Sequence, residues 1–284
     1  MQIGIFAKTF PRSTLEEAMD AAVEHGLHCM QFNLAVAGLP TMPDQINPEL
    51  IDRIRCAAEM RRIDLSAISG TFNMIHPNQI KVQADLNRLA MLAAACASMG
   101  TKIITLCTGT RNPVNQWHWH PDNLTPEAWH DLTSAMQQAL EIADRYDVTL
   151  AIEPELNNVV DSAQKGRKLL DETQSPRLKV VMDGANLFKQ GTLLQMRVIL
   201  EEAFALLGSD IVIAHAKDLT RDGEARQEAA GNGLLDYDYY IELLRAVHYT
   251  GPLILHGLGE DQVDRSVAFL RSKLNVEPDP YYLI

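Results

Sequence analysis

The chain of 284 residues has a formal net charge of −12, from 37 acidic against 25 basic side chains, and 46% of its residues are apolar. This balance is typical of a globular protein with a sizeable core and argues against long disordered stretches, while the acidic excess argues against nucleic-acid binding. Four scattered cysteines without a CxxC pair indicate reduced thiols, which predicts a cytoplasmic protein. We also expect neither a secretory signal nor a membrane span, since no basic leader or apolar run of ~18 residues is present.

Short apolar runs alternate with helix-like stretches along the chain. Residues 13–17 (Ser-Thr-Leu-Glu-Glu) offer a helix N-cap with early acids, Gly100 stops a helix, and Thr125-Pro126 opens one. The predicted strands are 2–6, 28–34, 65–69, 102–107, 149–152, 178–182, 211–214 and 252–255. The predicted helices are 13–25, 47–62, 82–99, 125–146, 162–172, 192–207, 239–248 and 261–274. The two longest predicted loops are 108–125 and 217–237.

Eight strands in strict alternation with eight helices predict parallel pairing and right-handed crossovers. Eight such units close a barrel, so the sequence predicts the α/β class and a single (β/α)8 TIM barrel domain over residues 1–284. An open doubly wound sheet is the alternative. Residues 6–10 (Phe-Ala-Lys-Thr-Phe) do not form the Gly-rich phosphate loop expected after the first strand of such a sheet.

The last four predicted strands each end on an acidic residue or a histidine: Glu153, Asp183, His215 and His256. Because barrel strands converge on one mouth, which holds the active site of such enzymes, we expect these side chains to meet there. Taken singly, each is more often a helix cap or a hydrogen-bonded loop residue. Together they form a mixed oxygen and nitrogen set that suits one divalent ion of Mn, Fe, Co or Zn better than Mg or Ca.

Other polar residues in the same loops are candidate substrate-binding groups. Asn73 follows the third strand, where turn chemistry is the alternative. His118 and His120 alternate with tryptophans in the loop 108–125, a pattern that suits a lid contacting the faces of a sugar. The alternatives for this loop are a hydrophobic plug or a subunit contact in a homo-oligomer. Lys217 and Arg221 follow closely on the seventh strand and suit an enolate, carboxylate or phosphate, with solvated loop charges as the alternative.

At these residues the sequence resembles the sugar-phosphate isomerase/epimerase superfamily of xylose isomerase-like barrels. That superfamily includes ketose 3-epimerases, inosose dehydratases, hydroxypyruvate isomerases and barrel-type AP endonucleases. The resemblance spans the whole chain. It is carried by Ile152-Glu153-Pro154, by Asp183 with Asn186, by residues 215–218 (His-Ala-Lys-Asp) and by residues 231–236.

The resemblance implies a set of roles. In the epimerases of this superfamily a Glu, an Asp, a His and a Glu on strands five to eight hold one divalent metal, which makes Glu153, Asp183 and His215 expected ligands. The two Glu residues of that pattern are also the acid/base pair on the two faces of the sugar carbon. The resemblance further implies that Arg221, six residues after the strand-seven His, binds substrate, and it makes Asn186 a candidate for the same role.

The sequence departs from this pattern at the eighth strand, where His256 takes the place of a Glu. A histidine can ligate a metal and can act as a general base near neutral pH, but it does not reproduce the charge of a carboxylate. Glu260, four residues further on, is the alternative group for that face of the substrate.

The first hypothesis is therefore an isomerase or epimerase of a free or phosphorylated ketose or polyol, acting through a metal-stabilised enediolate. Glu153 would be one catalytic proton-transfer group, and His256 or Glu260 the other. A keto-inositol-type dehydratase on the same site is the second hypothesis, and a sugar-binding barrel without turnover is the third. We expect a small-molecule sugar as the partner, and no nucleic acid or membrane.

Overall fold

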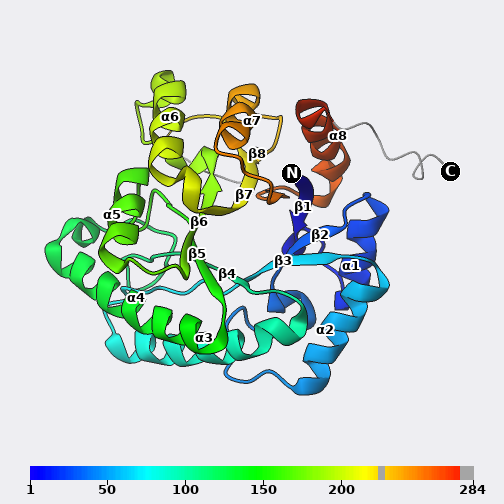
Figure 1. The fold of residues 1–284 in the computed structure, drawn as a ribbon, viewed down its shortest axis with the longest axis horizontal. Helices are drawn as coiled ribbons and strands as arrows, with labels where there is room; N and C mark the ends of the chain where they lie inside the picture. Colours follow the sequence, from blue (N-terminus) through cyan, green and yellow to red (C-terminus); the bar gives the residue numbers. More distant parts are fainter. Residues whose placement is uncertain (223–227, 276–284) are drawn as a thin grey trace.

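Among the residues that the computed structural model describes, 1–222 and 228–275, eight parallel strands close into a barrel (Figure 1). Each strand pairs with its neighbour round the ring, and the pairing of Gln2 with Pro252 begins the contact that joins the first strand to the last. The barrel strands are β1 (Gln2–Phe6), β2 (Cys29–Phe32), β3 (Asp64–Ser69), β4 (Ile103–Leu106), β5 (Thr149–Ile152), β6 (Leu178–Asp183), β7 (Ile211–Asp218) and β9 (Pro252–Leu255).

Helices surround the barrel and cover the outer face of its strands (Figure 1). The first helix, α1 (Leu15–Glu24), begins with a capping box. The hydroxyl of Thr14 accepts the Glu17 N–H at 3.2 Å, and the Glu17 carboxylate accepts the Thr14 N–H at 3.1 Å. The third ends at Gly100, whose φ of 100° requires a residue without a Cβ. The helices are α1 (Leu15–Glu24), α2 (Pro48–Met60), α3 (Gln79–Met99), α4 (Pro126–Tyr146), α5 (Ala163–Thr173), α6 (Met196–Leu207), α7 (Tyr237–Ala246) and α8 (Val263–Leu274).

The predicted (β/α)8 barrel is confirmed, and the open doubly wound sheet is wrong. Most elements lie within a few residues of their predicted bounds, and the strand β7 with the loop after it differs most from the prediction. β7 runs to Asp218, four residues beyond its predicted end, and the predicted loop 217–237 contains a short strand, β8 (Glu228–Ala229), antiparallel to the end of β7. The Asp218 carboxylate holds this turn, because it accepts the N–H groups of Leu219, Gly231 and Leu235 at 2.9, 3.1 and 2.9 Å.

A small apolar cluster fills the barrel interior, separate from the large core between strands and helices. It comprises Cys29, Ala67, Ala151, Val181, Ile213 and Ile254. Its packing is close, since a Cβ at Gly4 of β1 would lie 2.6 Å from the side chain of Ile254. Successive residues of a strand point to opposite faces, so the residue two positions after each member of this cluster points into the barrel again. The residues at those positions are Gln31, Ser69, Glu153, Asp183, His215 and His256.

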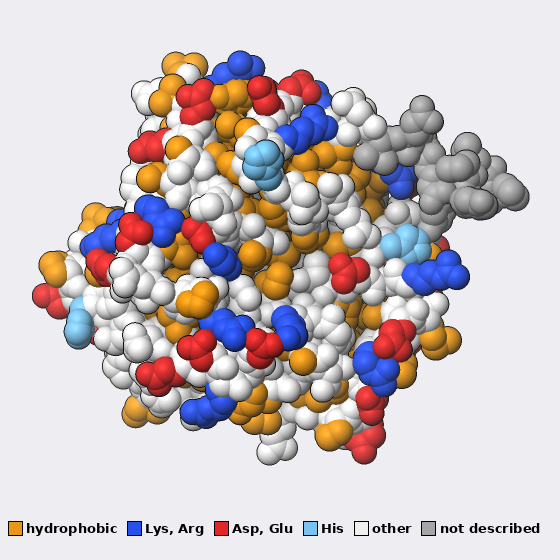
Figure 2. All heavy atoms as spheres, viewed as in Figure 1, with side chains coloured by type: hydrophobic (Ala, Val, Ile, Leu, Met, Phe, Trp, Pro, Cys, Tyr) orange, Lys and Arg blue, Asp and Glu red, His pale blue; other side chains and the backbone are white. Residues whose placement is uncertain are grey.

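The barrel interior thus changes from apolar to polar at one level, at the carboxyl ends of the strands. On the face shown in Figure 2, acidic and basic side chains stand side by side and do not gather into one basic patch. No helix among the described residues is long and apolar enough to cross a membrane.

Candidate active site at the carboxyl ends of the strands

A cavity of about 840 Å³ opens above the small apolar cluster in the barrel interior. Its wall carries many uncharged polar groups, among them the side chains of Asn33, Thr41 and Thr71. The loop between β4 and α4 contributes Gln116 and Trp117. A cavity of this size with convergent polar groups is the usual form of a small-molecule site.

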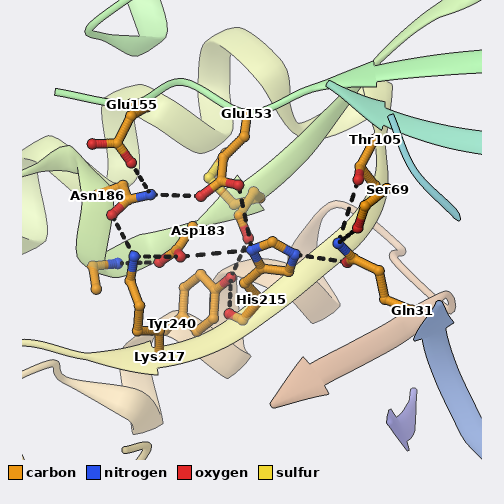
Figure 3. Close-up of polar contacts among 12 residues, drawn as sticks. Gln31, Ser69, Thr105, Glu153, Glu155, Asp183, Asn186, His215, Lys217 and Tyr240 are labelled. Carbon is orange, nitrogen blue, oxygen red and sulfur yellow. Dashed lines mark hydrogen bonds and ion pairs between the residues drawn. The ribbon is translucent and has the colours of Figure 1, made fainter. Parts of the chain in front are cut away.

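Glu153, Asp183 and His215 meet at the floor of this cavity, which Glu153 and His215 line, and each comes from a different strand, β5, β6 or β7 (Figure 3). Nδ1 of His215 lies 3.6 Å from Oε2 of Glu153 and 3.6 Å from Oδ2 of Asp183. Each side chain offers one ligand atom, and the three atoms lie within 4.8 Å of one another. The structure therefore brings together three of the four predicted ligands.

Two of these ligand atoms, Oδ2 of Asp183 and Nδ1 of His215, are buried without a hydrogen-bond partner among the described residues. Leaving buried polar atoms without such a partner costs free energy. A cation among Glu153, Asp183 and His215 would engage both atoms, and the oxygen and nitrogen donors match a transition-metal ion. The side chains present therefore fit a divalent metal.

A second layer of polar contacts connects these ligands to one another (Figure 3). Nζ of Lys217 lies 3.1 Å from Oδ2 of Asp183 and donates to Oδ1 of Asn186 at 2.6 Å. Nδ2 of Asn186 donates to Glu153 at 2.5 Å and to Glu155 at 3.0 Å. Asn186, placed by the short helix η4 (Gly184–Leu187), therefore links both carboxylates that flank Pro154 to the buried ammonium group.

This arrangement shifts the protonation of the buried groups. Burial opposes ionisation of Asp183, but Lys217 and His215 outweigh it and hold the pKa of its carboxyl group well below the usual range. Burial disfavours the imidazolium form of His215, but Glu153 and Asp183 raise its pKa to about 9. Burial, together with the nearby Glu153, raises the pKa of Glu155 to about 7 in spite of Lys217.

The other ring nitrogen of His215 faces Gln31 on β2. Nε2 of His215 lies 3.0 Å from Oε1 of Gln31, whose own amide nitrogen lies 3.4 Å from Oγ of Ser69 and 3.3 Å from Oγ1 of Thr105. Sequence reasoning missed Gln31 and Glu155. A polar residue inside the apolar second strand, and a second Glu directly after Glu153-Pro154, were the signals that could have found them.

His256 lies on the same floor but does not belong to the group of three ligands. Its ring stacks on that of His215, with centroids 4.7 Å apart and planes 8° apart, and lies 4.9 Å from the ring of Phe6. Burial, with the nearby charges of His215 and Lys217, lowers the pKa of His256 well below its usual range. His256 is therefore a neutral imidazole at the cavity wall.

Glu260 and Arg221 are not among the described residues that line the cavity. Glu260 begins the short helix η7 (Glu260–Gln262), and Arg12 donates to both of its carboxylate oxygens, at 2.5 and 2.8 Å. Arg221 lies exposed on the loop after β7. Lys217, by contrast, lines the cavity, and Asn186 contacts the lining residue Glu153.

Three predicted substrate-binding residues make local contacts in the loops. Asn73 is buried and accepts the Ile75 N–H at 3.3 Å, which is the turn chemistry given as its alternative, and it also exchanges hydrogen bonds with the backbone of Thr110 in the next loop, at 2.8 and 2.9 Å. His120 caps the short helix η3 (Pro121–Leu124) by accepting the Asp122 N–H at 3.2 Å. His118 is exposed. Neither histidine nor Asn73 is among the described lining residues of the cavity.

A family model described as xylose isomerase-like TIM barrel matches residues 19–273. Three solved structures share the fold, and their likeness extends to the fold alone at these identities. The 3-keto-D-glucoside 4-epimerase YcjR of E. coli is 16% identical, with a TM-score of 0.73 over 96% of this chain and 99% of its own. The probable 3-DHS dehydratase AsbF of Bacillus anthracis is 14% identical, with a TM-score of 0.72 over 95% and 98%.

The third structure is that of the IOLI protein with a bound zinc atom. It is 14% identical, with a TM-score of 0.72 over 97% of this chain and 98% of its own. No curated protein sequence matches the chain at a significant level.

Proposed function

The chain belongs to the xylose isomerase-like TIM barrel family, as its sequence predicted, and on that premise we propose that it is a sugar isomerase or epimerase. The observation that carries the proposal is the meeting of Glu153, Asp183 and His215 on the floor of a polar cavity, with two buried ligand atoms left without a hydrogen bond. Such a site suits proton transfer at a carbon next to a carbonyl group.

We propose that Glu153, Asp183 and His215 hold one divalent ion of Mn, Fe, Co or Zn, in keeping with their mixed donors. A bound ion would polarise the sugar carbonyl and stabilise the negative charge of an enediolate. The fold relative with a bound zinc atom supports this assignment.

Among the chain's own residues, Glu153 is placed to remove or return the carbon-bound proton. Its side chain is 21% exposed and lines the cavity, whereas that of Asp183 is fully closed off. Glu155 shares the amide of Asn186 with Glu153, and a pKa of about 7 suits it to exchange protons near neutral pH. His256, as a neutral imidazole at the wall, is the proposed base for the second face of the substrate.

Lys217 is the proposed group for a substrate oxygen that becomes negative. An ammonium group has three N–H donors. Nζ donates to Asn186 and forms an ion pair with Asp183 at 3.1 Å, and Lys217 also lines the cavity. We propose that another of its N–H donors binds the substrate oxygen.

The test is exchange of a substrate C–H with solvent deuterium. Protein reconstituted in turn with Mn, Co and Zn is incubated in D2O with free and phosphorylated ketoses, and the sugars are followed by proton NMR and mass spectrometry. We expect exchange at a carbon next to the carbonyl, and loss of that exchange in Glu153→Gln. No exchange with any of these sugars would count against the proposal.

A dehydratase is the second candidate. The specific observation in its favour is that His256, a neutral imidazole, stands where the family's epimerases have a second carboxylate, while the neighbouring strand β7 supplies the ammonium group of Lys217. Elimination needs a proton donor for the departing hydroxyl, which Lys217 supplies. A product lighter than the substrate by one water distinguishes this reaction from isomerisation, in which the mass is unchanged. Tight sugar binding without either product would favour the non-catalytic barrel.

A further inference from the structure

The side chain of Gln31 connects His215 to the opposite side of the barrel (Figure 3). Gln31 stands on β2, Ser69 on β3 and Thr105 on β4, whereas His215 stands on β7. All four residues are buried, with exposed fractions of 4% or less. The amide nitrogen of Gln31 faces the hydroxyls of Ser69 and Thr105, which leaves its Oε1 facing Nε2 of His215 at 3.0 Å.

This contact determines which nitrogen of His215 carries a hydrogen. A neutral imidazole has one N–H, on Nδ1 or on Nε2, and the amide oxygen of Gln31 can only accept a hydrogen bond. The 3.0 Å contact is therefore a hydrogen bond when Nε2 carries the hydrogen. In the neutral ring, which is the form that binds a cation, the lone pair then lies on Nδ1, the buried atom without a hydrogen bond that faces Glu153 and Asp183.

We propose that Gln31 is a positioning residue, which selects the tautomer and the ring orientation in which His215 binds a divalent cation. The inference rests on the proposed function and adds to it a residue that does not itself contact the cation. Without the acceptor at Gln31, the two carboxylates that face Nδ1 attract the hydrogen of the ring to that atom. The hydrogen then occupies the nitrogen that a cation needs, and the cation has to displace it.

The first test is zinc affinity, measured by competition with a chromophoric chelator on the full chain. Gln31→Leu removes the acceptor at similar volume, and we expect it to weaken zinc binding by about 10–100-fold, the usual effect of removing such a partner. Gln31→Glu keeps an acceptor, and we expect an affinity within about tenfold of the original protein. Gln116→Leu is the matched control, because it makes the same change in a cavity-lining glutamine that is not hydrogen-bonded to His215.

The second test reads the tautomer directly and does not depend on how well a variant folds. In zinc-loaded protein labelled with ¹⁵N-histidine, we expect an Nε2–H proton of His215 that exchanges slowly with water, in the original protein and in Gln31→Glu. In Gln31→Leu the hydrogen of a zinc-bound ring remains on Nε2, but without its acceptor we expect it to exchange fast with water, so that its signal is lost. A zinc-loaded original protein in which Nε2 of His215 carries no hydrogen would overturn the inference by itself.

The two proposals fail in different ways. If the original protein binds zinc no better than Asp183→Asn, the metal site of the proposed function is wrong and the role of Gln31 is wrong with it. The other outcome is that the original protein binds zinc tightly, while Gln31→Leu has a zinc affinity within twofold of it and keeps the Nε2–H signal. In that case only the role of Gln31 is overturned.

Discussion

The imidazole rings of His215 and His256 lie face to face, 4.7 Å between centroids and 8° between planes. One of them faces the two carboxylates of the proposed metal site, and the other does not. Two neighbouring imidazoles in a buried site are not both readily protonated to the positively charged imidazolium, since like charges repel strongly there. Repulsion in the stack therefore keeps His256 neutral, as its proposed role as a base requires, while His215 faces the carboxylates of the proposed metal site.

His256→Phe tests this division, because phenylalanine keeps an aromatic ring in the stack and removes both nitrogens. We expect a folded protein with unchanged metal content and a kcat lowered by about 100-fold or more, the usual contribution of a general acid or base. Steady-state kinetics and elemental mass spectrometry on the same preparation measure both quantities. A variant that lost its metal would identify His256 as a fourth ligand instead.

Asp183→Asn should abolish metal binding, since it removes one of the three ligand charges and leaves Lys217 buried beside a neutral amide. We expect about one equivalent of metal per original chain and almost none in the variant. Breaking a buried ion pair also costs about 3–5 kcal/mol in the free energy of unfolding. Asp210→Asn is the matched control, because Asp210 pairs with Lys179 and Arg167 and not with the ligands. Equal metal content in both variants would contradict the assigned site.

Glu155→Gln should change the pH dependence of stability in protein freed of metal by a chelator. The pKa of Glu155 rises from 4.5 in the unfolded chain to about 7 in the folded one, chiefly through burial. The folded state then binds the extra proton between these values, so this group lowers stability as the pH rises through that window. Glutamine imitates the protonated carboxyl group. We expect Glu155→Gln to raise Tm at pH 8 and to change it little at pH 5, by differential scanning calorimetry. Equal effects at both pH values would mean that Glu155 does not titrate in between.

Glu260→Gln distinguishes the two groups considered for the second face of the substrate. The Glu260 carboxylate accepts hydrogen bonds from Arg12 and does not line the cavity. We therefore expect kcat and KM within about twofold of the original protein. Exposed ion pairs contribute little to stability, and we expect a small change in Tm. A loss of kcat comparable to that of His256→Phe would show that Glu260 reaches the substrate after all.

The strands that the sequence predicts best are those whose apolar runs are bounded by turns. Thr149–Ile152 and Pro252–Leu255 have their predicted bounds. β7 was predicted to end at Ala214, because the residues after it are polar. It continues to Asp218, since those polar side chains find buried partners on other elements. Such partners belong to the tertiary structure and leave no mark in the local sequence.

The same distinction applies to the candidate site. The position of a residue at a strand end was enough to bring Glu153, Asp183 and His215 together, because the barrel makes those ends converge. Gln31 acts on a residue 184 positions away in the chain, and only the closed ring of strands brings the two into contact. Asn73 carried no signal that distinguished a substrate contact from the hydrogen bonds that the structure shows, one within its own turn and two to Thr110 of the next loop.

The pairing of β1 with β9 has a consequence for biosynthesis. The first strand emerges from the ribosome about 250 residues before its partner, since Gln2 pairs with Pro252. At translation rates of roughly 5–20 residues per second, that interval lasts on the order of 10–50 s. Throughout it β1 has β2 on one side and an open edge on the other, and an unpaired edge is where chains associate wrongly. The nascent chain therefore keeps an edge open to wrong association until its last strand is made.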